Sequence, residues 1–261
     1  MTCKNCNASL RTDFMYCPSC GAKIVASRLT FKGLFADVLE RFFDLDNSFY
    51  QTVKTMTVRP EQVIGSYIEG VRRRYLNPMS YLGVALGLSG FMFFIFQKYA
   101  IDMVEMDFLG TRSNIPANKK LMDAIIDFQT FVFLLYIPVI AFAGILSFNS
   151  RGYNLPEHFV SAIYTLSHIT ILTFPFSLLV ILLAPQAYLG YSLVSLLLMF
   201  LYSAFVLIRI HRYPNVLIVL IRTFVFMVLL MIGYFGISIG IHLLMLFSGI
   251  TTVQDYLPPE T

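Results

Sequence analysis

The distribution of polar and apolar residues divides the chain at about residue 78. The first part mixes charged and apolar positions, whereas the rest contains five long apolar runs, near residues 78–97, 125–147, 160–184, 187–209 and 221–248. A bilayer has a hydrocarbon core ~30 Å thick, which about 20 helical residues can cross. The runs lack the alternation of a barrel strand, so helices are the structure that can satisfy their backbone groups in lipid. The pattern predicts an all-α integral membrane fold with about five transmembrane helices.

Details within the runs predict how these helices are shaped and packed. Only "PQ" and its neighbours separate the third run from the fourth, which predicts a tight helical hairpin. Pro138 and Pro175 lie inside runs, where each removes a backbone donor and is expected to kink its helix. Glycines in the first and fifth runs indicate close helix packing, namely Gly83, Gly87, Gly90, Gly233, Gly236 and Gly240.

The polar segment ahead of the first run predicts short amphipathic helices. Apolar residues between positions 34 and 42 recur every three or four residues, with charged side chains between them. Pro60 suits the first turn of another helix. We therefore expect four parts: a small module over 1–25, amphipathic cytosolic or interfacial helices over 26–77, a transmembrane helical bundle over 78–250 and an exoplasmic tail over 251–261.

All the cysteines of the chain lie within its first twenty residues, as two Cys-x-x-Cys pairs: Cys3, Cys6, Cys17 and Cys20. Zinc favours four thiolates in a tetrahedron, and each pair can supply two of them from one turn. Gly21 follows the second pair and suits the left-handed conformation that such a turn needs. So short a module cannot bury a core of its own, so metal binding must supply most of its folding energy.

Two other interpretations of the cysteines are weaker. A redox pair is expected next to a βαβ unit, which the sequence does not indicate. Disulfides are expected in an oxidising compartment, whereas the charge pattern places the module in the cytoplasm. We therefore predict a structural zinc ribbon with four cysteine ligands and Zn²⁺ as its cofactor. Four cysteines close the coordination shell, so the metal is not expected to be catalytic.

Composition and charge support a membrane protein and predict its orientation. The chain is 57% hydrophobic and 13% charged, against about 25% charged in soluble domains. Of 19 Lys and Arg residues, 15 precede the first run or lie in the loops on the same side of the membrane. Because basic loops stay in the cytoplasm, we expect a multi-pass protein with a cytoplasmic N-terminus and an exoplasmic C-terminus.

Three consecutive arginines, Arg72, Arg73 and Arg74, stand just before the first run. The simplest interpretation is a topology anchor, because a basic cluster ahead of a first span keeps that side in the cytoplasm. The second interpretation is a binding site for an anionic lipid headgroup, to which each basic residue contributes ~1 kcal/mol. The two roles are compatible.

Few ionisable residues interrupt the apolar runs, and such residues are candidates for function. They are Asp127, His168 and His242. A metal or proton site needs at least two of them at one depth, but the two histidines differ in depth by roughly 18 Å at 1.5 Å per residue. Asp127 and His242 both lie toward the exoplasmic side. We interpret all three as packing residues with hydrogen-bond partners and keep an intramembrane site as the alternative.

Signatures of known catalytic sites do not stand out in the sequence. At the cytoplasmic side, Glu157 and His158 lie near loop arginines. They are the residues that an enzyme acting on lipids would use.

Several segments together resemble a bacterial family known as domain of unknown function 3667. They are "CPSCG", "RLTFKGLF" and "RPEQVIGSYIEGVRRRYLNPMSYL". The resemblance implies an integral membrane protein with a cytosolic zinc ribbon in a bacterial inner membrane, and it brings no activity or substrate. The residues that match the family's motif are Arg59, Pro60, Tyr67, Gly70, Arg72, Tyr75, Asn77 and Pro78.

The family motif places specific polar residues next to the arginine cluster. A topology anchor needs charge alone, whereas here the arginines come with Tyr75 and Asn77 in a fixed order. Arginine binds phosphate through two hydrogen bonds, and Tyr and Asn can hydrogen-bond at the membrane interface. The hypothesis is that Arg72, Arg73, Arg74, Tyr75 and Asn77 form an element that binds an anion or a partner.

Together these patterns favour a non-enzymatic inner-membrane protein whose zinc ribbon is an interaction platform. Its expected partners are anionic lipid and a cytosolic protein of unknown identity, and nucleic acid is not expected. A small-molecule or ion transporter or channel is the first alternative, and an enzyme acting on lipids is the second. The sequence does not set the oligomeric state.

Overall fold

The structure is a computed structural model, and it describes residues 1–22, 24, 48–99 and 129–252. Over these residues the regular elements are helices, and strand-like pairing is limited to isolated bridges, one of which joins Thr2 and Ser9. The helices are α2 (Ser48–Val58), α3 (Pro60–Ile68), α4 (Pro78–Tyr99), α6 (Gln129–Ser147), α7 (Leu155–Leu183), the 3₁₀ turn η2 (Pro185–Ala187), α8 (Tyr188–His211) and α9 (Val216–Phe247). The predicted all-α class is confirmed for this part of the chain.

Four of these helical segments are long and apolar enough to cross a membrane: α4, α7, η2 with α8, and α9. The fifth predicted span corresponds to α6, whose apolar part, Phe131–Ser147, is shorter. The structure therefore supports four to five spans in a multi-pass membrane protein. Large apolar side chains cover the outside of these helices, as lipid contact requires.

Two helices begin about a turn earlier than the apolar runs predict. Asn154 caps α7, because its side chain accepts from the Glu157 N–H while the Glu157 carboxylate accepts from the Asn154 N–H. This capping box starts the helix at Leu155 rather than near residue 160. Likewise, Asn215 accepts from the Leu217 N–H, so α9 starts at Val216 rather than near residue 221. A hydropathy pattern does not detect polar capping residues, and it therefore places both helix starts too late.

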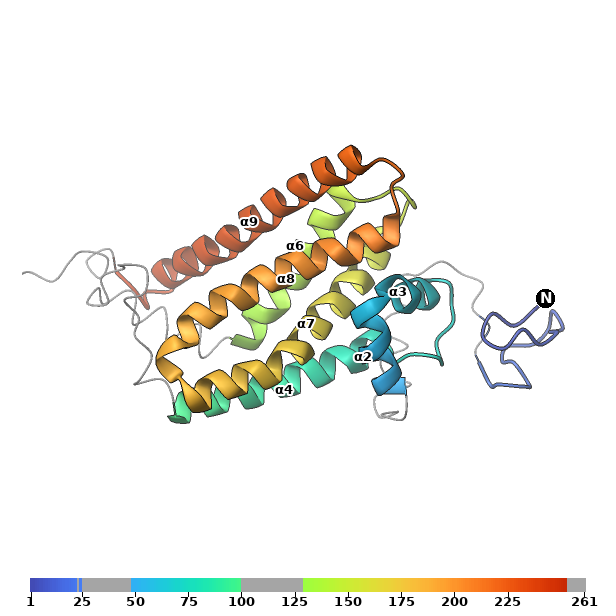
Figure 1. Ribbon diagram of the computed structural model, residues 1–261, viewed down its shortest axis with the longest axis horizontal. Helices are drawn as coiled ribbons and strands as arrows, with labels where there is room; N and C mark the ends of the chain where they lie inside the picture. The colour runs from blue at the N-terminus through green and yellow to red at the C-terminus, as the bar shows by residue number, and fades with distance from the viewer. Residues whose placement is uncertain (23, 25–47, 100–128, 253–261) are drawn as a thin grey trace, which may run out of the picture.

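Helix α7 lies at the centre of the bundle. It packs against α4, α6 and α8, while α9 packs mainly on α6 and also contacts α8 (Figure 1). The tight hairpin predicted between the third and fourth runs is confirmed, because η2 joins α7 directly to α8. Pro138 and Pro175 lie inside α6 and α7, as expected.

Helices α2 and α3 pack onto one end of the bundle, against α7 and α8 (Figure 1). Met56, Val63 and Ile64 are fully buried and belong to the same hydrophobic cluster as the long helices. Over residues 48–77, the segment ahead of the first span thus holds two short helices, and both are part of the bundle core. The pattern over residues 34–42 and the tail from residue 253 lie outside the described residues.

The glycines pack less closely than expected. Gly233 faces Val139 of α6, where an added Cβ would clash. For Gly83, Gly87 and Gly90 of α4, by contrast, no neighbouring atom lies within 4 Å of where a Cβ would be, and the same holds for Gly236 and Gly240. Within the part of the chain that the structure describes, these three glycines of α4 therefore do not pack against another helix, whereas Ala85 of the same helix is fully buried.

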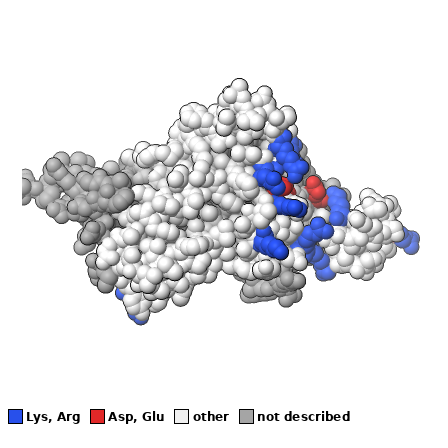
Figure 2. Space-filling view, viewed as in Figure 1, with Lys and Arg blue, Asp and Glu red and all other residues white. Residues whose placement is uncertain are grey.

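Basic side chains gather at the end of the bundle that carries α2 and α3 (Figure 2). Arg209 and Arg212 of the α8 C-terminus pair there with Glu61 of α3, and Arg222 of α9 reaches the end of α6. Lys98, in the last turn of α4, lies at the opposite end of that helix. This is the clustering that the charge pattern predicts.

Candidate functional site

The four cysteines of the N-terminal module form one cluster. Their sulfur atoms all lie within 4.8 Å of one another, with Cys3 and Cys20 at 3.7 Å and Cys6 and Cys17 at 3.6 Å. All four are free thiols, so no disulfide closes the module. A metal bound at the Zn–S distance of about 2.3 Å would place tetrahedral sulfurs about 3.8 Å apart. The residues therefore fit a metal ion with four thiolate ligands, without a large rearrangement.

Two copies of one turn build this cluster. In the first, the Cys3 N–H donates to the Ala8 carbonyl and the Asn7 N–H donates to the Cys3 carbonyl, both at 2.8 Å. The second copy repeats this pattern from Cys17 to Ala22 with nearly equal distances. Asn7 and Gly21 occupy the same left-handed position, with φ of 60° and 61°. The predicted role of Gly21 is confirmed, whereas the repeat of "CKNCNA" as "CPSCGA" was missed in the sequence.

The thiols differ in acidity. Hydrogen bonds from the Asn5 side chain and the Ala22 backbone lower the pKa of Cys20 to about 6. At Cys6 a backbone hydrogen bond from Ala8 lowers the pKa, but the neighbouring thiols outweigh it and raise the pKa to about 12. The first thiol of the cluster therefore loses its proton at a lower pH than a free thiol does. Binding of a cation would have to displace the protons that remain on the other thiols.

The module is joined to the bundle by two hydrogen bonds between polar groups. Arg73 Nη1 donates to the Cys20 carbonyl at 2.7 Å, and Lys4 Nζ donates to the Glu69 carbonyl at 2.8 Å. The guanidinium also lies against Gly21, where an added Cβ would come within 2.7 Å of Arg73 Nη1. Arg73 thus binds the second cysteine turn at Cys20, a candidate metal ligand, next to the left-handed Gly21.

The three consecutive arginines have three different environments. Arg72 is half-buried, with its guanidinium 5.4 Å from the centre of the Tyr67 ring. Arg73 holds the cysteine module, as described. Arg74 is exposed, and no hydrogen bond or ion pair of its side chain is found among the described residues. Of the three, Arg74 is the one free to reach a lipid headgroup.

Two further residues of the predicted anion-binding element build the fold. Asn77 is buried, and its Oδ1 accepts from the Ser80 N–H at 2.8 Å, so that it caps the start of α4 ahead of Pro78. Tyr75 packs partly against the main core. Their places in the motif are thus explained by helix capping and packing, and their predicted anion binding stays a prediction.

His168 of α7 is fully buried, and its contacts connect four helices. Its Nδ1 lies 2.7 Å from the Tyr81 hydroxyl of α4, and its Nε2 lies 3.2 Å from Thr57 Oγ1 of α2. The Tyr202 ring of α8 packs beside it, and the Tyr202 hydroxyl donates to the Met56 carbonyl. His168 has the hydrogen-bond partners expected of a packing residue, and this network fixes α2 to the bundle.

The other predicted intramembrane residues are His242 and Asp127. His242 is half-buried in α9, with Nδ1 2.8 Å from the Ser238 carbonyl one turn earlier. Asp127 lies outside the described residues, so its expected proximity to His242 stays a prediction.

A buried ion pair that the sequence did not indicate joins α3 to α8. Glu61, with 7% of its side chain exposed, accepts from Arg209 Nε at 3.1 Å and from Arg209 Nη2 at 2.7 Å. Arg212 Nη2 lies 3.5 Å from the same carboxylate. Glu61 follows Pro60 in the first turn of α3, which looks like an ordinary helix start. Its partners are 148 and 151 residues away, so spacing along the chain gave no signal.

His158, which the lipid-acting-enzyme hypothesis would use, is buried together with His211. His158 and His211 are 1% and 3% exposed, and their rings lie 5.7 Å apart with an angle of 17° between planes. His158 Nε2 and both ring nitrogens of His211 have no hydrogen-bond partner among the described residues. The Glu157 carboxylate is occupied by its capping box. Glu157, His158 and His211 therefore lie close together, but their side chains are buried, so a substrate has no access to them.

Comparison with known proteins gives one match. Residues 46–90 match the family described as "Protein of unknown function (DUF3667)", which confirms the resemblance over this stretch. The match spans α2, α3, the arginine segment and the first half of α4, which is the unit docked on α7 and α8. No curated protein and no solved structure matches the chain.

Proposed function

We propose that this is a non-enzymatic protein of a bacterial inner membrane, in which a zinc-bound N-terminal ribbon serves as a cytosolic interaction platform. In this proposal the ribbon sits on a basic membrane surface that binds anionic headgroups. The observation that carries the proposal is the contact between the cysteine module and the arginine segment, through Arg73 and Lys4.

Zinc is the proposed metal because four thiolates suit its borderline-soft character and its tetrahedral preference. A closed shell of four cysteines leaves no open position for a substrate, so the proposed role is structural. The cytoplasmic side follows from the basic end of the bundle, since positively charged loops stay inside. With that orientation, the cysteines also stay reduced.

The module offers a surface for a protein partner. Met15 and Tyr16 are 74% and 48% exposed and are neighbours in the chain. Exposed apolar side chains of this size are typical of protein contact sites. The proposed partner is a cytosolic protein that packs on these two residues.

The lipid part of the proposal rests on Arg74 and its neighbours. Arg74 has an exposed guanidinium just ahead of the first span, and Arg59 and Lys54 of the same docked unit are also exposed. Each such residue near an anionic leaflet contributes ~1 kcal/mol. Arg72 and Arg73 are engaged within the protein, so they contribute charge without being free to rearrange.

The test compares lipid retention by full-length variants in nanodiscs of mixed phosphatidylglycerol and phosphatidylcholine. Arg74→Gln should lower the retained phosphatidylglycerol, measured by mass spectrometry, by up to about fivefold, the equivalent of ~1 kcal/mol. Arg11→Gln is the matched control, because Arg11 is exposed on the module and paired with Asp13. If both variants retain the same amount of phosphatidylglycerol, the arginine segment is a topology anchor and does not bind the headgroup.

A further inference from the structure

A cavity of about 200 Å³ lies among α6, α7 and α8. Apolar side chains form part of its wall, including Phe133, Leu196 and Met199. Hydroxyl groups form the rest, and they come from all three helices: Tyr136 of α6, Thr170 and Thr173 of α7, and Ser192 and Ser195 of α8. Among the residues that line it there is no charged side chain.

The cavity lies deep in the membrane-spanning part. On α7 its lining residues run from Leu166 to Thr173, which is about 16–27 Å from the helix start at 1.5 Å per residue. On α8 they run from Met199 back to Ser192, about 18–29 Å from the end of that helix at His211. The two ranges agree, so the cavity lies at one depth. Counted from the basic ends of these helices, that depth runs from about the middle of a bilayer ~30 Å thick into its opposite half.

Two of the hydroxyls lack a partner. Thr173 Oγ1 donates to the Ile169 carbonyl, and Ser192 Oγ donates to the Leu189 carbonyl, so these groups are satisfied within their own helices. The hydroxyls of Tyr136 and Ser195 have no hydrogen-bond partner among the described residues. A hydroxyl without a partner in hydrocarbon is costly. Two such donors on different helices, facing one cavity, indicate that a bound molecule supplies acceptors.

Depth and charge define that molecule. Because no charged group lines the cavity, an ionised ligand would be unpaired inside the hydrocarbon, where charge is costly. A phospholipid headgroup carries an ionised phosphate, which this uncharged lining cannot pair. The acceptor must therefore belong to a neutral, wholly lipid-soluble molecule. A planar ring would pack against the Phe133 ring and the Met199 thioether.

We propose that this cavity binds the ring of a lipid-soluble quinone, whose two carbonyl oxygens accept hydrogen bonds from Tyr136 and Ser195. The volume suits one ring and not a whole lipid, so the isoprenoid tail would leave between the helices into the surrounding lipid. The site is separate from the cysteine module, and the proposal does not depend on the platform function.

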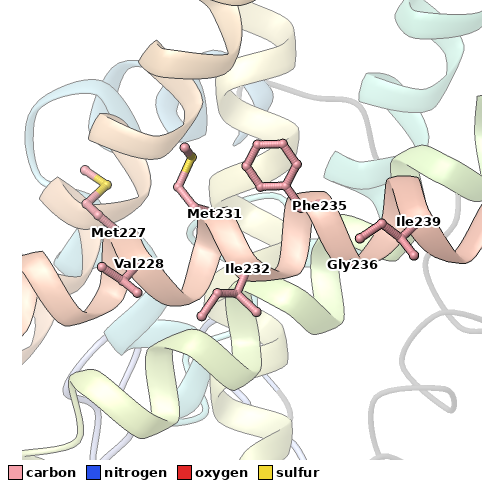
Figure 3. Close-up of a pocket in the computed structure, with 7 residues that line it drawn as sticks. All are labelled: Met227, Val228, Met231, Ile232, Phe235, Gly236 and Ile239. Atoms are coloured by element: carbon pink, nitrogen blue, oxygen red, sulfur yellow. The ribbon is translucent and has the colours of Figure 1, made fainter.

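A second groove on the molecule provides a matched control. It has a volume of about 550 Å³ and is lined by α9 side chains alone, from Met227 to Ile239 (Figure 3). Met231 and Phe235 project to one side of the helix and Ile232 to the other, and none of the labelled side chains carries a hydrogen-bonding group (Figure 3). In a bilayer, acyl chains would fill this groove, and it has no polar group with which to select a ligand.

The experiment uses the absence of tryptophan from the chain. Phe133→Trp places a single fluorophore in the cavity wall, Leu196→Trp places one on another wall, and Phe235→Trp reports on the α9 groove. Each full-length variant, in phosphatidylcholine nanodiscs, is titrated with ubiquinone-1, which quenches tryptophan. Saturable quenching is expected for at least one of the cavity reporters, and quenching linear in quinone content is expected for Phe235→Trp.

The hydroxyl donors are then removed in the reporter that saturates. Tyr136→Phe and Ser195→Ala should each raise the half-saturating quinone concentration about fivefold, as the loss of one hydrogen bond predicts. Ser192→Ala, whose hydroxyl bonds within its own helix, should leave it unchanged. Linear quenching at both cavity reporters, equal to that at position 235, would overturn the proposal and leave the cavity to water or acyl chains. Saturation that neither substitution weakens would overturn the roles of Tyr136 and Ser195.

Discussion

The guanidinium of Arg73 donates a hydrogen bond of 2.7 Å to the main-chain carbonyl of Cys20. This contact links a candidate metal ligand of the N-terminal module to the segment that leads into the first span. An arginine that a charge count assigns to topology therefore also positions a folded module. Arg72 and Arg74, its neighbours in the chain, do not make this contact.

The first prediction concerns this contact. Arg73→Ala should loosen the module, because it removes a charge-assisted hydrogen bond whose net worth at an exposed site is ~1 kcal/mol or less. Hydrogen–deuterium exchange of the Gly21 amide and its neighbours should rise up to about fivefold. Arg74→Ala removes the same charge without this hydrogen bond and serves as the control. Equal exchange in the two variants would contradict a specific role for Arg73.

The second prediction concerns metal content. The purified protein should carry about one zinc ion per chain, and Cys17→Ser should lose it, because Cys17 is buried at the centre of the cluster. Elemental analysis measures the metal, and circular dichroism should show the helical bundle retained, since the module and the bundle belong to separate hydrophobic clusters. Iron in place of zinc, or no metal at all, would refute the assignment.

The third prediction concerns the buried ion pair. Glu61→Gln leaves Arg209 with a neutral partner and should destabilise the docking of α3 on α8. A fully buried pair costs about 3–5 kcal/mol when broken, but the Arg209 side chain is 41% exposed, so about 1–2 kcal/mol is expected here. Thermal unfolding in detergent measures the change. Glu69→Gln, at the C-terminus of the same helix, is the comparison that should stay near wild type.

The fourth prediction concerns His211. Its two ring nitrogens are buried without a partner among the described residues, so the native state already bears their desolvation cost. His211→Leu should therefore leave the unfolding temperature unchanged or raise it, because an apolar group of similar volume removes that cost. His168→Leu removes a histidine with two partners and should destabilise the protein by ~1–3 kcal/mol. A large loss of stability in His211→Leu would reveal a bound molecule or a partner at that site.

The apolar helices and the cysteine cluster could be predicted because both signals are local. A span needs only a sufficiently long apolar run, and a Cys-x-x-Cys turn brings two ligands together within four residues. The role of Gly21 followed from its position alone, and its φ of +61° confirms it. Helix starts were placed late at α7 and α9, because Asn154 and Asn215 are polar residues that a hydropathy pattern reads as loop.

The polar contacts of the candidate sites could not be predicted, because they join residues far apart in the chain. Thr57 meets His168 over 111 residues, and Glu61 meets Arg209 over 148. Nothing in the order "RRR" separates the role of Arg73 from that of Arg74. The difference arises only when the Cys20–Gly21 turn of the module packs against the Arg73 side chain. Likewise, Tyr136 and Ser195 look like ordinary polar interruptions until α6 and α8 bring them to one cavity.

The central place of α7 has a consequence for how the protein is made. The docked unit of α2, α3 and the start of α4 is synthesised early, but its polar groups find their partners late. Tyr81 can bond to His168 only after 87 more residues have been made. The Leu76 carbonyl can accept from the Tyr164 hydroxyl only after 88 more residues. At about 5–20 residues per second, the ribosome needs roughly 4–18 seconds to add that much chain. For that interval the first span stands in the membrane without its neighbour, and the insertion machinery must shelter its polar end until α7 arrives.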